Sequence, residues 1–231
     1  HKTIKYTGEI CSACGGSGDF LPISIQDLLK NPLLDMTKGI DVIFHGAGRE
    51  DIDVRCLGRG RTFIVEVVNP KLRTIDLEHL SMTINREFSE QIHITPLHLA
   101  TKAEVLELKD DSEHVQKEYH SLVYLCQPLD EDEFNKIYPE AQEILTTKAI
   151  FQRTPLRVVH RRADKTREKR IYSINGRYLD PCHLYFDICA QGGTYIKELV
   201  SGDEGRTSPS LSEIFKTPMI SVELDVIYNE E

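Results

Sequence analysis

Hydrophobic and polar residues in this chain follow two repeats: the alternation of a half-buried strand and the three-to-four-residue spacing of an amphipathic helix. Helical spacing, or a glycine-rich start followed by a helix-forming run, predicts helices over residues 24–34, 76–90, 130–145 and 194–200. Alternating or β-branched runs predict strands over residues 40–45, 61–68, 91–99, 119–126, 171–174, 183–189 and 220–228. Short elements of both kinds are therefore interleaved along the chain.

The order of these elements indicates the fold class. Strands and helices do not alternate regularly along the chain, and several strands lie close enough in sequence to form hairpins. Asn175-Gly176 is one candidate for such a turn, and Asp180-Pro181 is another. We expect an α+β fold with helices on one face of a mixed or antiparallel sheet, and with the other face free to form a cleft. Residues 1–38 read as a lead-in segment with a short helix, and residues 39–231 as one domain.

Composition narrows the class of protein. The chain has 231 residues, of which 40% are hydrophobic and 28% charged, as expected for a globular domain with a sizeable core. It has no apolar run of 18 residues, so we expect no membrane span. Its first residues, His1–Lys5, contain no signal sequence and read as part of a longer protein. Six scattered cysteines do not suit a disulfide framework, so we expect an intracellular protein, in the nucleus, the cytoplasm or both.

Charge is distributed unevenly along the chain, whose net charge is −9. Residues 153–170 hold eight Arg or Lys against two acids, whereas residues 102–146 hold twelve acids against four bases. Such segregation is typical of a protein that binds a polyanion on one face. On charge alone, a solvated basic loop balanced by an acidic helix is an equally good interpretation.

The stretch from Gly46 to Arg55 is the richest in reactive groups. It combines glycines, two arginines and three acids in ten residues between two predicted strands. Glycines let a substrate approach the backbone, and a carboxylate beside arginines stays ionised. A loop in which these charges only pair with one another is the alternative. The stretch lacks the Lys-Ser or Lys-Thr of a phosphate-binding loop, and the chain has no Gly-x-Ser-x-Gly elbow.

Two further motifs have ordinary structural alternatives. Residues 191–199 join a strand to a helix through Gly192-Gly193-Thr194, which is a common junction in itself. Cys11 and Cys14 have half the spacing of a zinc site, but no second close pair of Cys or His completes the four ligands that a structural site needs.

Together these residues carry a resemblance to a known family. Gly48-Arg49-Glu50-Asp51 resembles the Gly-Arg-x-Asp signature of pseudouridine synthases, and residues 193–197 resemble their Gly-Thr-Tyr-Ile-Arg/Lys motif. The longer strings 48–55, 154–162, 193–198 and 202–207 are similar, in the same order, to the archaeal and eukaryotic tRNA pseudouridine synthase family that acts on uridines 54 and 55 of the TΨC arm. The resemblance runs from about Val42 to Val226.

The resemblance implies roles for individual residues. Asp51 would be the nucleophile, a role that needs neither a metal ion nor a redox cofactor, and Lys197 would pair with it. Tyr119 would stack on the flipped uracil, Tyr195 would be a second pocket residue, and Arg49 would orient the loop or contact a phosphate.

The resemblance also implies tRNA as the partner. The residues expected to grip its phosphates are Arg153, Arg157, Arg161, Arg162, Arg167, Lys169 and Arg170. Members of the family carry an N-terminal RNA-binding domain with a zinc site, which we expect to be missing from this chain. A non-catalytic RNA-binding module of the same fold is the rival interpretation. A metal-dependent nuclease would need more converging acids than Asp51 and Asp53 supply.

Overall fold

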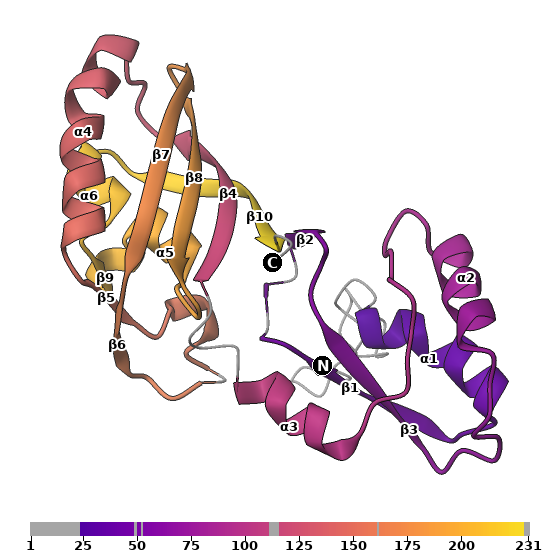
Figure 1. The fold of residues 1–231 in the computed structure, drawn as a ribbon. Helices are drawn as coiled ribbons and strands as arrows, with labels where there is room; N and C mark the ends of the chain where they lie inside the picture. Colours follow the sequence, from indigo (N-terminus) through magenta and orange to yellow (C-terminus); the bar gives the residue numbers. More distant parts are fainter. Residues whose placement is uncertain (1–23, 49, 52, 111–115, 161, 229–231) are drawn as a thin grey trace, which may run out of the picture. The chain divides into compact units, whose positions relative to one another are not determined.

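The computed structural model describes residues 24–48, 50–51, 53–110, 116–160 and 162–228, which form two compact units. The first comprises residues up to 46 together with 63–106, and the second comprises 47–62 and the residues from 107 onward (Figure 1). Within the described ranges, no helix has the length and apolar character needed to cross a membrane. Residues 1–23 of the expected lead-in, with Cys11 and Cys14, lie outside the described residues, and the division at residue 38 stays a prediction.

The first unit is a two-stranded antiparallel ribbon with two helices. Its elements are α1 (Ile25–Thr37), β1 (Asp41–Gly46), β3 (Phe63–Val68) and α2 (Leu77–Glu87), and α3 (Lys102–Asp110) follows them. Ser24 and Asp27 cap the start of α1 reciprocally in a capping box. Leu29 of α1, Val42 of β1 and Leu80 of α2 are buried in one hydrophobic cluster, which holds the helices on the ribbon.

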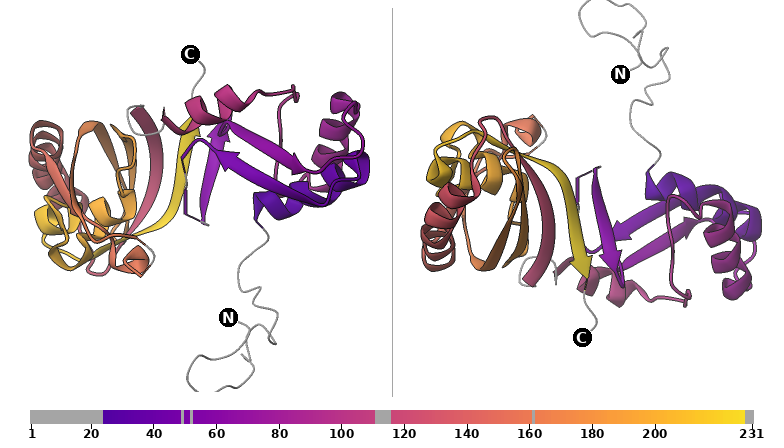
Figure 2. Two further views of the ribbon diagram at one scale, coloured as in Figure 1. Left: turned by 90° about the horizontal axis from the view of Figure 1, so that it is seen from below. Right: turned by 90° about the horizontal axis from the view of Figure 1, so that it is seen from above.

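The second unit contains a five-stranded mixed sheet. Its strands, in spatial order, are β2 (Val54–Gly58), β10 (Met219–Tyr228), β4 (Gln116–Leu125), β8 (His183–Gln191) and β7 (Ile171–Asp180). All neighbours are antiparallel except β10 and β2, which are parallel. Alternate residues of β4 and β8 are buried against α4 (Glu131–Thr147), α5 (Ile196–Ser201) and α6 (Leu211–Phe215). Figure 2 shows these helices on one side of the sheet. The expected α+β fold with a mixed sheet is confirmed.

A smaller sheet accompanies it. Strands β6 (Thr166–Lys169), β5 (Ile150–Arg153) and β9 (Thr207–Ser208) lie in that order. After β5 the chain makes a single 3₁₀ turn, η2 (Leu156–Val158), and η3 (Asp203–Gly205) precedes β9. The turn η2 places its residues beside the start of α5, and this positions the site described below.

One expectation differs from the structure, and one of the two candidates for a hairpin turn is confirmed. Residues 91–99 form no strand, because the Asn85 side chain satisfies the backbone of Ile94 instead: its Oδ1 accepts from the Ile94 N–H at 2.7 Å and its Nδ2 donates to the Ile94 carbonyl at 2.9 Å. The hairpin turn falls at Asp180-Pro181, whereas Asn175-Gly176 lies inside β7. A Cβ on Gly176 would stand 2.7 Å from the Tyr138 ring, so this glycine serves close packing and not a turn.

Candidate active site

Asp51 lies in the loop that leads into β2. The N–H of Val54 donates to the Asp51 carbonyl at 3.1 Å, a bond that an extended run with Asp51 and Asp53 on one side would not make. The Asp51 side chain is 27% exposed, and its Oδ1 lies 2.6 Å from Nη1 of Arg157. A guanidinium in contact offsets the loss of hydration that partial burial imposes on a carboxylate.

Arg157 is held on its other side by Glu198. Its Nε donates to Glu198 Oε1 at 2.6 Å and its Nη2 to Oε2 at 3.2 Å, while the Glu198 side chain is 5% exposed. Burial opposes the positive charge, but the bonds and charges of Glu198 and Asp51 outweigh it and raise the pKa of Arg157 above its usual value. Arg157 is therefore a cation bonded to two carboxylates in this structure, and the expectation that it grips a phosphate stays a prediction.

Lys197 pairs with Asp53 and not with Asp51. Its Nζ lies 2.6 Å from Oδ1 and 2.5 Å from Oδ2 of Asp53, and this bond is the main cause that lowers the pKa of Asp53. The expected contact between Lys197 and Asp51 is thus replaced by two separate pairs. The reason is that Arg157, from a segment read as an RNA-contacting loop, already occupies Asp51.

Glu50, which the sequence did not single out, anchors the loop from the other side. Its Oε2 accepts from Arg61 Nη1 at 2.6 Å, and its Oε1 accepts from Lys117 Nζ at 2.6 Å and from the Tyr228 hydroxyl at 3.1 Å. The side chains of Glu50, Lys117 and Arg61 are 9%, 11% and 14% exposed. The charges near Asp51 therefore pair with one another, which is the alternative that the sequence left open for this stretch. This pairing fixes the loop.

The two tyrosines expected in the pocket occupy different environments. Tyr119 lies on the inner face of β4 with 6% of its surface exposed, and burial, together with the charge of Glu50, raises its pKa. Tyr195 is the N-cap residue of α5, and its hydroxyl accepts from Arg162 Nη1 at 3.0 Å. Their roles toward a base stay predictions.

The basic segment, residues 153–170, contains both exposed side chains and side chains bonded within the protein. Arg162 and Arg170 are exposed, and Arg167 is half-buried and donates to Thr154 Oγ1 at 3.2 Å. Lys169 is buried and donates to the Gly192 carbonyl at 2.8 Å, and its expected contact with a phosphate stays a prediction. Arg49 and Arg161 lie outside the described residues.

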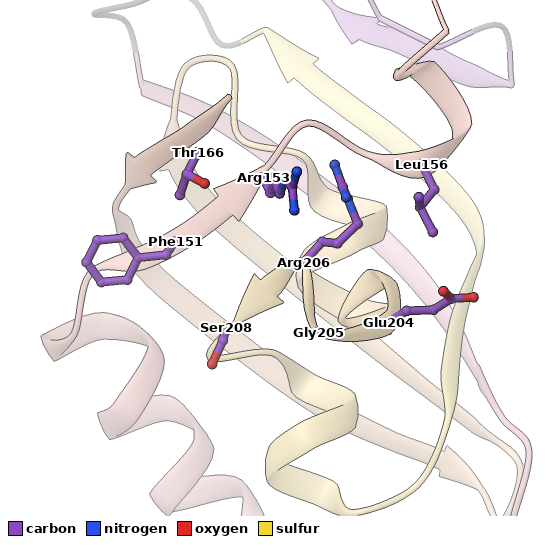
Figure 3. Close-up of a pocket in the computed structure, with 8 residues that line it drawn as sticks. All are labelled: Phe151, Arg153, Leu156, Thr166, Glu204, Gly205, Arg206 and Ser208. Carbon is purple, nitrogen blue, oxygen red and sulfur yellow. The ribbon is translucent and has the colours of Figure 1, made fainter. Parts of the chain in front are cut away.

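Arg153 lines an open cavity of about 500 Å³ (Figure 3). The cavity is lined by Phe151, Arg153, Leu156, Thr166, Glu204, Gly205, Arg206 and Ser208. Arg153 and Arg206 each place a guanidinium nitrogen 2.6 Å from the Asp164 carboxylate. Two arginines thus meet one carboxylate at this wall, and Arg153 is already paired.

Among the described residues, no group of three or more His, Cys, Asp or Glu side chains is arranged to hold a metal ion. The loop presents one partly exposed carboxylate, that of Asp51, which the guanidinium of Arg157 fixes. A second ion pair joins Asp53 of the same loop to Lys197. A carboxylate held in this way can act as a nucleophile in covalent catalysis.

Known proteins are similar to this chain over nearly all of its length. The family model described as Pus10, C-terminal matches residues 10–229. The chain is 39% identical over 223 residues to the tRNA pseudouridine synthase Pus10 of Methanocaldococcus jannaschii, with 96% of this chain and 47% of that protein covered. It is 42% identical over 220 residues to the protein of the same name from Methanothermobacter marburgensis, with 95% and 53% covered. The chain therefore spans about half the length of these curated relatives.

Solved structures are less similar. A chain of a Cbf5–Nop10–Gar1 complex matches 49% of this chain and 30% of its own length, with a TM-score of 0.36 and 23% identity. A chain of an H/ACA RNP bound to a substrate RNA containing 2′-deoxyuridine matches 85% and 41%, with a TM-score of 0.39 and 12% identity.

Proposed function

The chain belongs to the family of Pus10 C-terminal domains, and from this premise we propose that it isomerises uridine to pseudouridine in tRNA. One observation supports the proposal most: the aspartate of the Gly-Arg-x-Asp signature, Asp51, is a partly exposed carboxylate held at 2.6 Å by an arginine that is itself anchored. We propose uridines 54 and 55 of the TΨC arm as the targets, and an intracellular site of action, where tRNA is found.

In the proposed reaction Asp51 is the nucleophile. Its carboxylate attacks either the uracil ring or the ribose carbon, and the bond between C1′ and N1 breaks. The freed base rotates, C5 forms the new bond to C1′, and the bond between Asp51 and the substrate breaks, which regenerates the carboxylate. The C5 proton is lost and N1 gains a proton. Substrate and product have the same composition, so no oxidant or reductant is consumed. Arg157 and Glu50 act before this chemistry, by fixing the loop that carries Asp51.

The target base must leave its stack to reach a carboxylate beside the sheet. We propose that Tyr119 and Tyr195 line the position that it enters, with Arg49 orienting the loop. Burial first, and then the charge of Glu50, raise the pKa of Tyr119, and the influence of Glu50 supports a place beside the catalytic loop. Because Tyr119 is buried, only part of its ring would be offered to a base.

Loss of the C5 proton provides the test of the proposed function. A tRNA transcript carrying tritium at C5 of uridine should release tritium to water when it is incubated with this chain. If the chain alone releases none, the assay is repeated with a chimera, in which this chain replaces the matching half of the Methanocaldococcus jannaschii relative. Release by neither protein, while the unaltered relative is active, would contradict the proposal and favour a non-catalytic RNA-binding module.

Pseudouridine formation should persist in excess EDTA, because an aspartate nucleophile needs no metal ion. The assay uses a transcript folded in monovalent salt, so that the chelator acts on the protein and not on the RNA. Release of tritium with and without EDTA should agree within about twofold. Loss of turnover that is restored by one added divalent ion would instead point to metal-assisted chemistry.

The exposed and half-buried arginines of the basic segment should control the salt dependence of tRNA binding. Replacing Arg162, Arg167 and Arg170 with alanine should weaken binding and flatten the slope of log affinity against log salt by about two, at roughly 0.7–0.9 per phosphate contact. The measurement is an anisotropy titration at several salt concentrations. Arg177→Ala is the control, since Arg177 is an exposed arginine that lies outside the segment. An unchanged slope in the triple variant would place the segment away from the RNA.

A further inference from the structure

Two consecutive residues at the start of α5 reach two of the three acids of the loop, Asp53 and Asp51. Lys197 contacts Asp53 directly, whereas Glu198 contacts Asp51 only through the guanidinium of Arg157. The outer acid, Asp53, is 62% exposed and its partner 21%, while the inner pair of Arg157 and Glu198 is 34% and 5% exposed. The more deeply buried of the two connections is therefore the one that leads to Asp51.

The contact between Glu198 and Arg157 fixes the guanidinium in direction as well as in position. Both oxygens of Glu198 accept from Arg157, at 2.6 Å from Nε and 3.2 Å from Nη2. Two bonds in one plane fix the orientation of a guanidinium, which a single bond to a rotating side chain does not. The third nitrogen, Nη1, is then directed to a single place, and there it meets Asp51.

Both ends of this connection rest on a rigid frame. Gln152 of β5, which is 1% exposed, accepts from the Tyr195 N–H at 2.8 Å and donates to the Tyr195 carbonyl at 2.9 Å. Strand β5 leads to the turn that carries Arg157, and Tyr195 is the N-cap of the helix that carries Glu198. Because a buried side chain of one element is bonded twice to the backbone of the other, the spacing between Glu198 and Arg157 is set by the fold.

We propose that Glu198 is a positioning residue of the reaction, which acts through Arg157 to hold the carboxylate of Asp51 where it meets the substrate. This inference rests on the proposed function. It assigns a task to a buried acid that touches no part of the loop itself. A carboxylate nucleophile must be held close to its line of attack, and a misplacement of about 1 Å lowers a rate by about a hundredfold.

The test is a double-mutant cycle in single-turnover pseudouridine formation at saturating tRNA. Glu198→Gln keeps the shape of the side chain but removes its charge and one acceptor. Arg157→Lys keeps the charge but cannot bond three oxygens in one plane. Each variant should lower the rate by about a hundredfold, with tRNA affinity unchanged within about twofold. The double variant should be no slower than Arg157→Lys alone, because Glu198 acts only through Arg157.

A matched control separates this task from general support of the fold. Arg55→Lys alters another two-bonded pair of the same unit, in which Arg55 meets Asp225 at 2.6 and 2.7 Å, and its rate should stay within about twofold of the wild type. Thermal unfolding is recorded for every variant. If Glu198→Gln does not unfold cooperatively, Glu198→Asp takes its place, since it keeps the buried charge but withdraws the carboxylate by one methylene; the same cycle result is expected.

Two outcomes would overturn the inference. Effects of Glu198 and Arg157 that multiply in the double variant would show that they act independently, and a wild-type rate in Glu198→Gln would show that Arg157 needs no anchor. Either outcome leaves the proposed function intact, provided that the unaltered chain forms pseudouridine and Asp51→Asn does not. Absence of turnover in the unaltered chain would instead refute the proposed function itself.

Discussion

Replacing Asp51 with asparagine should lower the single-turnover rate of pseudouridine formation by about ten-thousandfold or more, to background. The amide keeps the size of the side chain and an oxygen that can accept from Arg157, but it is no longer a nucleophile. The affinity for tRNA should change by less than about twofold, since binding draws on phosphate contacts elsewhere. The loss should therefore appear in turnover at saturating RNA and not in the titration.

Asp53→Asn is the matched control, because it removes one carboxylate from the same loop two residues away. Asp53 is largely exposed and paired with Lys197, so its loss should reduce the rate by no more than about tenfold. The reverse order, with Asp53→Asn inactive and Asp51→Asn active, would assign the nucleophile to Asp53. The pair with Lys197 would then be the productive contact.

Replacing Glu50 with glutamine should lower the free energy of unfolding by about 3 kcal/mol, the lower end of the range for breaking a buried ion pair from one side. The variant leaves Arg61 and Lys117, both largely buried, without their shared carboxylate. Urea denaturation at neutral pH measures the change. Asp187→Asn is the control: Asp187 is 36% exposed in its pair with Arg177, so its loss should cost less than about 1 kcal/mol.

The same cluster predicts a dependence on pH. Burial acts to raise the pKa of Glu50, but Lys117 and Arg61 outweigh it and lower the pKa below the ordinary value of 4.5. The unfolded chain therefore takes up this proton first, so the contribution of Glu50 is complete above about pH 4.5 and is lost as the pH falls through the folded pKa. The difference in the free energy of unfolding between wild type and Glu50→Gln should therefore shrink as the pH falls below about 4.5. A constant difference would mean that the charge of Glu50 is not what stabilises the fold.

The spacing of hydrophobic residues predicts helices and strands correctly where one face of the element is buried. Helix α2 and strands β4, β8 and β10 bury alternate or helically spaced side chains, and each falls within a few residues of its predicted range. Residues 91–99 alternate like a strand but form none, because the Asn85 side chain bonds the N–H and the carbonyl of Ile94. The sequence of residues 91–99 alone does not reveal this contact.

The candidate site was predictable in its parts but not in its pairings. Asp51, Asp53 and Lys197 stand out as reactive residue types in short motifs, yet the choice of partner depends on which elements fold together. Arg157 belongs to a basic run and its contact with Asp51 spans more than a hundred residues of sequence, so composition assigned it to RNA. Lys169 was assigned to RNA for the same reason, and only the position of Gly192 reveals that it is buried. Glu50 was overlooked because a buried acid that binds two cations looks, in sequence, like any charged loop residue.

The central claim, that Asp51 of this chain isomerises uridine in the TΨC arm, is tested most directly by a pseudouridine map of an unmodified tRNA transcript at single-base resolution. The transcript is incubated with the chain, or with the relative in which the chain replaces the matching half, and in parallel with the Asp51→Asn form of each. We predict pseudouridine at position 54, position 55 or both with the unaltered protein, and at neither with Asp51→Asn. Pseudouridine at the same positions with Asp51→Asn, or its absence from both positions with every unaltered form, would contradict the account.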